Sequence, residues 1–323
     1  MAAQMRLFQD QRPRKMPSRQ ELLALVPRVH PKYELVWKGL SEDDQVALAG
    51  YFLPRRSEKE FIEPTRPKVV KWYCPFASQC QFPSGHRYCI NVYVGCSHNC
   101  RYCYAAAYEP DKAGTKRDFQ RGIDRDMEEL EAFDVPPAPV HLSNSVDPLQ
   151  PLERTTGHTR YALEQILAHR RRFTTVTMLT KNPLLPVEMG YVDLFKKLMT
   201  LPRNHPQHAE FDAHDAPAFQ VHVSLAFWND DSRVAYEPDA PTVDQRREGV
   251  LRLREAGIPV VLRIDPLFPR SPLPTAPVRT LQDFGVAEAQ TSVDLENLVQ
   301  FARRAGVRHV VYSALKIVQP RRR

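Results

Sequence analysis

The pattern of hydrophobic and polar positions changes near Tyr88. From there, short apolar, β-branched runs alternate with longer amphipathic stretches, as expected for buried strands separated by helices. We predict six strands, at Ile90–Val94, Val140–Ser143, Thr174–Leu179, Phe219–Leu225, Pro259–Ile264 and His309–Ser313. The stretches between them predict helices at Asp118–Phe133, Thr159–Arg171, Val187–Met199, Val243–Ala256 and Asp294–Ala305. Two of these helices are followed by glycine, at Gly257 and Gly306, which is a helix C-terminal signal.

Strands that alternate with helices favour an α/β fold with a parallel sheet and right-handed crossovers. Six such units predict a partial (β/α)6 TIM-type barrel, in which functional residues lie at the C-terminal ends of the strands. We expect residues 1–87 to form a partly irregular N-terminal extension with short helices at Glu21–Val26 and Glu42–Tyr51. The barrel is expected to span 88–318, and 319–323 to be a basic tail.

The composition is that of an ordinary globular protein, with 42% hydrophobic and 26% charged residues in 323. No stretch approaches the ~20 apolar residues of a membrane helix, and Met1 to Lys15 lacks an apolar signal core, so we expect a cytoplasmic protein without membrane association.

The net charge of +7 favours anionic partners, nucleic acid among them. A solvated basic surface explains the charge equally well.

Three of the six cysteines are closely spaced in a loop that follows the first predicted strand. Cys96, Cys100 and Cys103 have the spacing C-x3-C-x2-C. Three thiolates on so short a loop can ligate three irons of a [4Fe-4S] cluster and leave the fourth iron without a protein ligand. S-adenosylmethionine (SAM) can chelate such an iron through its amino and carboxylate groups, and an electron from the cluster then cleaves it to a 5′-deoxyadenosyl radical. A zinc knot is the alternative, although zinc sites normally use four protein ligands.

Other potential ligands lie outside this loop. Cys74, Cys80 and Cys89 are widely spaced, and they could hold a second metal, supply a hydrogen donor or simply pack as thiols. The segment 202–218 contains three histidines that could bind metal or be solvated, namely His205, His208 and His214. The sequence leaves both questions open.

The chain resembles the radical SAM superfamily and, more closely, spore photoproduct lyase and its relatives, from about Tyr88 to about Leu315. Besides the loop from Gly95 to Tyr104, the resemblance rests on Asn144 to Asp147, Thr180-Lys181, Val223-Ser224 and the run from Glu237-Pro238 through Asp244 and Arg246 to Ala256-Gly257.

The resemblance implies specific roles for residues of this chain. Cys96, Cys100 and Cys103 would ligate the cluster, whereas Lys181 and Ser224 would contact SAM. Tyr102 and Tyr104 flank the last cysteine, where the lyase keeps tyrosines near the adenosyl group and along its hydrogen-transfer route. The catalytic candidates are therefore Tyr102, Tyr104 and Asn144, with Tyr102 also a cofactor contact. A flavodoxin- or ferredoxin-type electron donor is the implied partner.

Departures from the lyase pattern matter for function. Asn144 stands where the lyase has its catalytic cysteine, and an amide cannot donate a hydrogen atom as a thiol can. The chain ends at Arg323, without room for the later hairpin with which the lyase engages damaged DNA. We therefore expect a radical SAM enzyme, of lyase or oxidoreductase type, that abstracts hydrogen from an unidentified substrate. The alternatives are a nucleic-acid-binding protein with a structural or redox-sensing Fe-S cluster, and a DNA-lesion lyase.

Overall fold

The structure is a computed structural model of the whole chain, and it describes residues 17–25, 40–51, 68–71, 88–110, 112–201, 217–268 and 290–316. Cys74, Cys80 and the three histidines of the segment 202–218 lie outside the described residues. So do most of the predicted extension and the basic tail. The predicted domain boundaries stay predictions.

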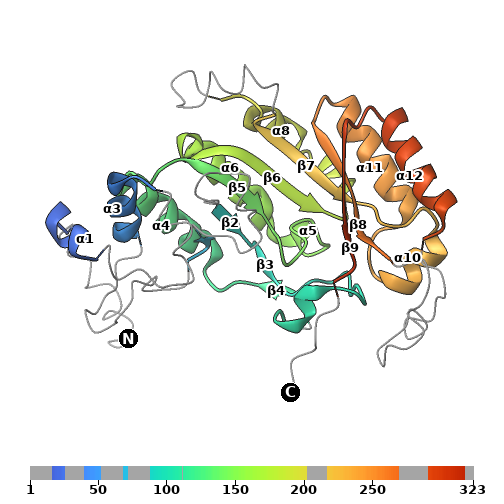
Figure 1. Cartoon of the computed structure of the whole chain (residues 1–323), viewed down its shortest axis with the longest axis horizontal. Coiled ribbons are helices and arrows are strands. Elements are labelled where there is room, and N and C mark those ends of the chain that lie inside the picture. Colours follow the sequence, from blue (N-terminus) through green and yellow to red (C-terminus); the bar gives the residue numbers. More distant parts are fainter. Residues whose placement is uncertain are drawn as a thin grey trace, which may run out of the picture.

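A seven-stranded sheet forms the centre of the fold, in the order β1-β2-β5-β6-β7-β8-β9 (Figure 1). Six of its strands are parallel and follow one another in chain order, whereas β1 is antiparallel to β2. The strands are β1 (Val70–Lys71), β2 (Tyr88–Ile90), β5 (Ala138–Leu142), β6 (Phe173–Thr180), β7 (Phe219–Ser224), β8 (Val260–Leu267) and β9 (His309–Ala314). A separate two-stranded ribbon pairs β3 (Tyr93–Val94) with β4 (Gly114–Thr115).

Helices occupy most of the connections between the parallel strands. The longer ones are α3 (Glu42–Tyr51), α4 (Phe119–Ala132), α6 (His158–Ala168), α11 (Val243–Glu255) and α12 (Ser292–Arg304). The shorter ones are α1 (Arg19–Leu25), α5 (Glu153–Thr156), α7 (Leu185–Glu188), α8 (Val192–Leu198) and α10 (Asp230–Tyr236), with 3₁₀ turns η4 (Tyr104–Ala107) and η5 (Arg170–Arg172). Figure 1 shows α11 and α12 side by side next to β8 and β9. No helix in the described part of the chain is long and apolar enough to cross a membrane.

The predicted α/β class and the parallel sheet are confirmed, but two predicted elements are divided. The first predicted strand splits into β2 and β3 because the chain turns at Asn91, whose carbonyl accepts a bond from Lys116 and whose side chain accepts one from the Asn144 N–H. The helix predicted at Val187–Met199 splits into α7 and α8 at Gly190, which has a φ of +70°. Such a backbone conformation interrupts a right-handed helix.

Strand β1 and helix α10 were not predicted from the sequence. A two-residue strand such as β1 has no periodicity to detect, and its position depends on long-range contacts. The Tyr51 hydroxyl donates to the Val70 carbonyl at 2.6 Å, which joins α3 to β1. Leu48 and Tyr51 also belong to the main hydrophobic core. Part of the predicted extension therefore packs on the sheet.

The parallel strands have one apolar face and one mixed face because successive side chains alternate. Val140, Met178 and Val221 are buried in one core with helical residues such as Ile166 and Leu253. The alternate positions carry polar groups such as His141, Thr177, His222 and Arg263. Among the described residues β1 and β9 are edges that do not pair, so the sheet is open and no closed barrel forms.

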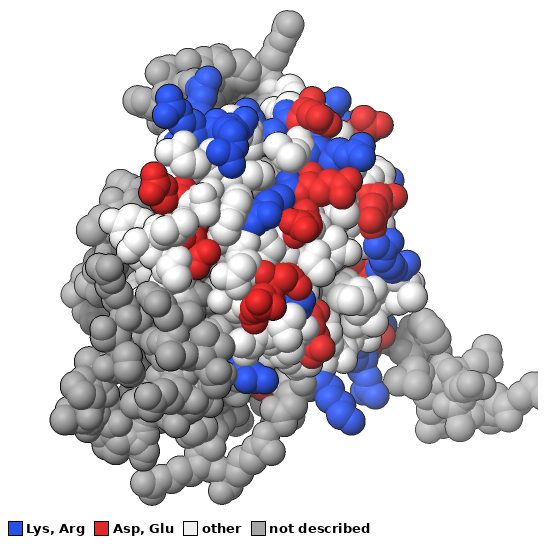
Figure 2. Space-filling view, turned by 90° about the vertical axis from the view of Figure 1, so that its right-hand side faces the viewer, with Lys and Arg blue, Asp and Glu red and all other residues white. Residues whose placement is uncertain are grey.

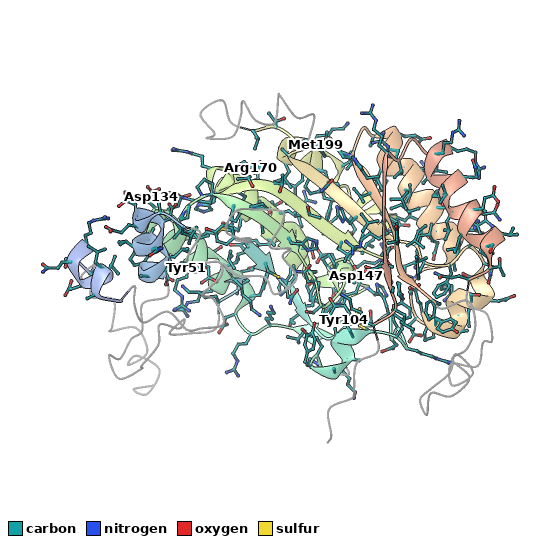
Figure 3. The ribbon with its side chains drawn as sticks, in the orientation of Figure 1. Tyr51, Tyr104, Asp134, Asp147, Arg170 and Met199 are labelled. Atoms are coloured by element: carbon teal, nitrogen blue, oxygen red, sulfur yellow. The ribbon has the colours of Figure 1, made fainter. Side chains whose placement is uncertain are left out.

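The two ends of the sheet differ in chemistry. Asp147 and Tyr104 lie at the C-terminal ends of the parallel strands, and Arg170 and Met199 lie at the opposite end (Figure 3). The buried Arg170 guanidinium donates to the carbonyls of Thr174, Leu198 and Ala218, and thereby joins the segments that lead into the sheet. The polar end that contains Asp147 carries the candidate site.

We predict that Gly249→Ala destabilises the fold because a Cβ on this residue of α11 would lie 2.4 Å from the backbone nitrogen of Leu184. Overpacking of this kind costs about 1–3 kcal/mol, measurable by urea unfolding. Gly114→Ala is the matched control, because its Cβ would meet only a Val94 methyl at 3.6 Å. Equal stability of the two variants would contradict the close approach of α11 to α7.

Candidate functional site

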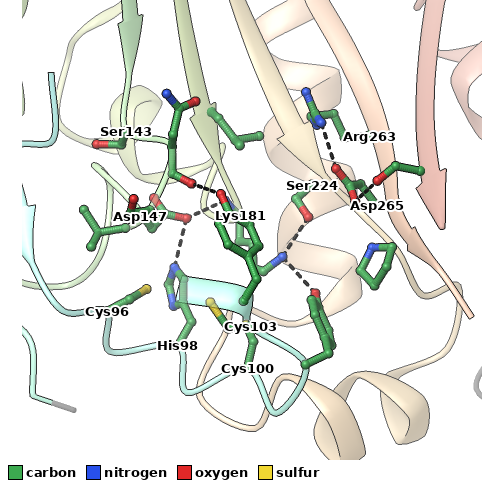
Figure 4. A pocket seen from close by; sticks show the side chains of 18 of the residues that line it. Cys96, His98, Cys100, Cys103, Ser143, Asp147, Lys181, Ser224, Arg263 and Asp265 are labelled. Carbon is green, nitrogen blue, oxygen red and sulfur yellow. Dashed lines mark hydrogen bonds and ion pairs between the residues drawn. The ribbon is translucent and has the colours of Figure 1, made fainter. Parts of the chain in front are cut away.

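A pocket of about 680 Å³ opens at the C-terminal ends of the parallel strands (Figure 4). All three motif cysteines line it, which are Cys96, Cys100 and Cys103. The other predicted site residues line it as well, namely Tyr102, Tyr104, Asn144, Lys181 and Ser224. Its volume is within the range of small-molecule sites. The structure therefore brings every predicted site residue to one cavity.

The cysteine loop begins at Gly95, directly after β3. Gly95 has a φ of +63°, and a Cβ on it would lie 2.3 Å from the Lys112 carbonyl oxygen. Only glycine fits there.

Gln150, which is fully buried, holds the loop on both sides of Cys96, because its amide accepts from the Ser97 N–H at 3.0 Å and donates to the Gly95 carbonyl at 3.3 Å. No pattern in the sequence indicates this role of Gln150.

Asp147 connects the cysteine loop to the strand ends. One carboxylate oxygen lies 3.0 Å from His98 Nε2 and accepts from the Lys181 N–H at 2.6 Å. The other accepts from the Thr180 hydroxyl and from the Leu149 N–H, both at 2.8 Å. Burial opposes ionisation of Asp147, but the bonds from His98 and from the two N–H groups outweigh it and lower its pKa. The ionised carboxylate therefore fixes the loop against β6.

Lys181 extends from the end of β6 across the pocket wall (Figure 4). Its ammonium donates to the Ser224 hydroxyl at 2.7 Å and to the Tyr102 hydroxyl at 3.1 Å, and it lies 3.0 Å from a Glu237 carboxylate oxygen. Tyr102 also donates to Glu237. The proposed SAM contacts Lys181, Ser224 and Tyr102 thus form one connected group.

Glu237 directly follows α10. Asn229 caps the start of this helix, because its side chain accepts from the Ser232 N–H at 2.8 Å. The carboxylate is fully buried and also pairs with Arg246 of α11 at 2.5 Å. Burial opposes its ionisation, but Arg246 and Lys181 lower the pKa of Glu237 to about 2. Both residues belong to the run that carries the family resemblance, but the sequence assigned them no role.

Tyr104 and Asn144 meet on another wall of the pocket. The Tyr104 hydroxyl donates to the Asn144 carbonyl at 2.6 Å. The Asn144 side-chain amide donates to the sulfur of Cys89 at 3.1 Å. Cys89 is buried in β2 and does not itself line the pocket among the described residues. The side chain of Asn144 is therefore held by a neighbouring cysteine sulfur.

A third polar group lies at the ends of β8 and β9 and was not predicted. Asp265 accepts from the Arg263 guanidinium at 2.7 Å and from the Ser313 hydroxyl at 2.5 Å, and all three residues line the pocket. The bonds from Ser313 and Arg263 outweigh the effect of burial and lower the pKa of Asp265. The pocket thus has a second charged wall.

The three motif cysteines are free thiols. Burial, with the nearby Asp147 charge, raises the pKa of Cys96 to about 11, and burial also raises the pKa of Cys100. Such thiols become thiolates only beside compensating positive charge, which a metal centre supplies. Within the described part of the chain, no three Cys, His, Asp or Glu side chains converge closely enough for a single metal ion. All three motif thiols line the same pocket, and three cysteine thiolates are a donor set that iron–sulfur clusters use.

No protein-family model matches the chain. It is 24% identical over 189 residues to an uncharacterized protein, MJ0683, of Methanocaldococcus jannaschii, a match that covers 57% of this chain and 62% of that protein. It is 30% identical over 194 residues to an uncharacterized protein, Rv2578c, of Mycobacterium tuberculosis, covering 57% of this chain and 50% of that one. The matched part is thus less than two thirds of either relative.

Among solved structures, the chain is similar to Streptococcus suis SuiB bound to S-adenosylmethionine (TM-score 0.43, 12% identity, 72% of this chain and 41% of that one). It is also similar to a spore photoproduct lyase complexed with dinucleoside spore photoproduct (0.43, 14%, 82% and 63%). A third is the methyltransferase TsrM from Kitasatospora setae with cobalamin and a [4Fe-4S] cluster bound (0.45, 13%, 71% and 34%). TsrM is a radical S-adenosylmethionine methyltransferase, and the SuiB structure holds S-adenosylmethionine.

We predict that Asp147→Asn lowers the free energy of unfolding at pH 7 by roughly 1.5–3 kcal/mol, because an amide nitrogen cannot accept the lost bonds. The folded pKa of Asp147 is below its ordinary value of 3.8, so this contribution is present at neutral pH and is lost as the pH falls from 3.8 through the folded pKa. Urea unfolding at pH 7 and at lower pH measures the difference. Asp134→Asn is the control, because that side chain is 90% exposed. If the difference in free energy of unfolding between the parent and Asp147→Asn persisted in acid, it would contradict the conclusion that Asp147 stabilises the fold as an ionised carboxylate.

Proposed function

We propose that this chain is a radical SAM enzyme that binds a [4Fe-4S] cluster and SAM and abstracts hydrogen from a substrate that is not yet identified. The observation that carries the proposal is the shared pocket. Three free thiols in the spacing C-x3-C-x2-C line the same cavity as Lys181, Ser224 and Asp147, at the C-terminal ends of parallel strands. That end is where enzymes built from successive β/α units hold their reacting groups.

The residues of the pocket would have separate roles in binding the cluster and SAM. Cys96, Cys100 and Cys103 would hold the cluster, which when bound supplies the electron for reductive cleavage of SAM. Lys181 would bind the SAM carboxylate through a charge-assisted bond, and the Ser224 hydroxyl can bond either polar end of the cofactor. Gln150 and Asp147 keep the cysteine loop in place against the strand ends.

The sequence predictions about the barrel, the electron donor, the location and the fate of SAM belong to the same proposal. The open sheet of six parallel strands in chain order supports a partial (β/α)6 barrel. A flavodoxin- or ferredoxin-type protein would deliver the electron, and the cytoplasm would be the place of action. Asn144 in place of a thiol favours consumption of SAM over its regeneration, because an amide cannot return a hydrogen atom.

A nucleic-acid substrate is the second candidate, and the charge of +7 favours it. On the face that Figure 2 shows, however, Lys and Arg side chains stand among Asp and Glu side chains and do not form one continuous basic surface. The charge pattern of this face therefore adds no support to the nucleic-acid candidate.

The test is to reconstitute the protein anaerobically, measure iron, reduce it and assay 5′-deoxyadenosine in the presence of SAM. We predict about four irons per chain and formation of 5′-deoxyadenosine. Replacement of Cys96, Cys100 or Cys103 by Ala should abolish both, because each supplies one thiolate. Cys89→Ala, which removes a buried thiol outside the pocket, should keep its iron.

Two outcomes would contradict the proposal in different ways. Unchanged iron content in the three motif variants would show that the cluster is not held by this loop. Full iron content without 5′-deoxyadenosine would favour the rival function, a structural or redox-sensing cluster.

A further inference from the structure

One fully buried cation and one partly buried cation share one buried carboxylate beside the pocket. Glu237 and Arg246 are fully buried, and the Lys181 side chain is 14% exposed. One Glu237 oxygen pairs with Lys181 and the other with Arg246. The three groups together carry one surplus positive charge. A buried charge is costly unless a partner compensates it, so the pocket side of this group favours an anion.

The Lys181 ammonium is held in a fixed direction. An ammonium has three N–H donors, and Lys181 has three polar partners, namely Tyr102, Ser224 and Glu237. Of these partners, Glu237 alone is charged. Burial lowers the pKa of Lys181, but Glu237 more than offsets this and keeps the lysine protonated. The charge and the direction of Lys181 both depend on this carboxylate.

Glu237 is itself held rigidly from outside the pocket. Arg246, which pairs with it, donates to the Ser224 carbonyl at 3.2 Å and to the Pro241 carbonyl at 3.0 Å. Tyr102, which lies between Cys100 and Cys103, donates to the same carboxylate. Glu237 therefore connects the cysteine loop, the ends of β6 and β7, and helix α11.

We propose that Glu237 is a positioning residue that acts through Lys181, holding the ammonium where it receives the carboxylate of SAM. This inference rests on the proposed function, because it takes SAM as the ligand. The surplus positive charge would meet the single negative charge of that carboxylate, which would replace one of the neutral partners of Lys181. Arg246 keeps Glu237 in place and does not touch the ligand.

The test measures SAM affinity in anaerobically reconstituted protein. Glu237→Gln keeps the shape of the side chain and removes its charge, so we expect SAM to bind about tenfold to a hundredfold more weakly, as for loss of a charge-assisted bond. Glu237→Asp keeps the charge and should recover most of the affinity. In a Lys181→Met background, Glu237→Gln should have no further effect, because the residue that it positions is gone.

A ligand variant tests the same point without reliance on stability. Decarboxylated SAM lacks the group that Lys181 would bind, so its affinity should be the same in the parent and in Glu237→Gln.

Glu153→Gln is the matched control. Glu153 is also fully buried and accepts from a tyrosine, Tyr191 at 2.5 Å, but it does not line the pocket among the described residues. Its loss should leave SAM affinity unchanged.

The outcomes separate this inference from the proposed function. Parent-like SAM affinity in Glu237→Gln would overturn the positioning role and leave the function standing. Additive losses in the double variant, or an equal loss for decarboxylated SAM, would also overturn it, since both indicate a merely structural role. If Glu237→Gln lost its iron, the SAM affinities of Glu237→Asp and Lys181→Met would be compared instead. Affinity close to that of the parent in Glu237→Asp and weak binding in Lys181→Met would support the positioning role, and equally weak binding in both would overturn it. A parent that holds its cluster and does not bind SAM would refute the proposed function and this inference with it.

Discussion

The candidate site depends on one buried carboxylate, that of Asp147. An ionised group inside a protein must be fully hydrogen-bonded, and Asp147 meets this need with donors from three separate segments. His98 comes from the cysteine loop, Leu149 from the chain just after Asp147, and Thr180 with Lys181 from the end of β6. Because all of these donors must meet the same two oxygens, the position of the cysteine loop follows from the positions of the strand ends.

A second buried carboxylate completes the arrangement. Asp147 accepts from the backbone N–H of Lys181 at 2.6 Å, and Glu237 lies 3.0 Å from the ammonium of the same residue. Lys181 is thus fixed at both its backbone and its side-chain end. The alternating pattern of the strands makes this possible, since one face packs against the helices and leaves the other for polar groups. The side chains that stabilise the fold and the side chains that form the site therefore lie on opposite faces of the same strands.

Much of the fold could be predicted from the sequence because it is encoded locally. Five of the six parallel strands are apolar runs that were predicted with nearly correct positions, whereas the first predicted strand overlaps β2 only at Ile90. The motif cysteines are close in sequence, so the loop that carries them was also predicted. The divisions at Asn91 and Gly190 were missed because they arise from a tertiary hydrogen bond and from a single backbone angle. The candidate site was predicted as a set of residues, but the contacts that assemble it were not.

Those contacts join residues that are far apart in the chain. Tyr102 and Glu237 are 135 positions apart, and Ser97 and Gln150 are 53 apart. No local pattern marks such a pair, so Gln150 looked like an ordinary loop residue. Glu237 and Arg246 were recognised only as part of a resemblance, and their role as a shared ion pair follows from burial, which a single sequence does not reveal.

We propose that Cys96, Cys100 and Cys103 hold a cluster with one iron open to SAM. Electron paramagnetic resonance of the reduced, reconstituted protein tests this claim most directly, with spectra recorded before and after SAM is added. We expect the spectrum to change, because the amino and carboxylate groups of SAM would bind the iron that lacks a cysteine. A cluster spectrum that stays identical at saturating SAM would contradict it.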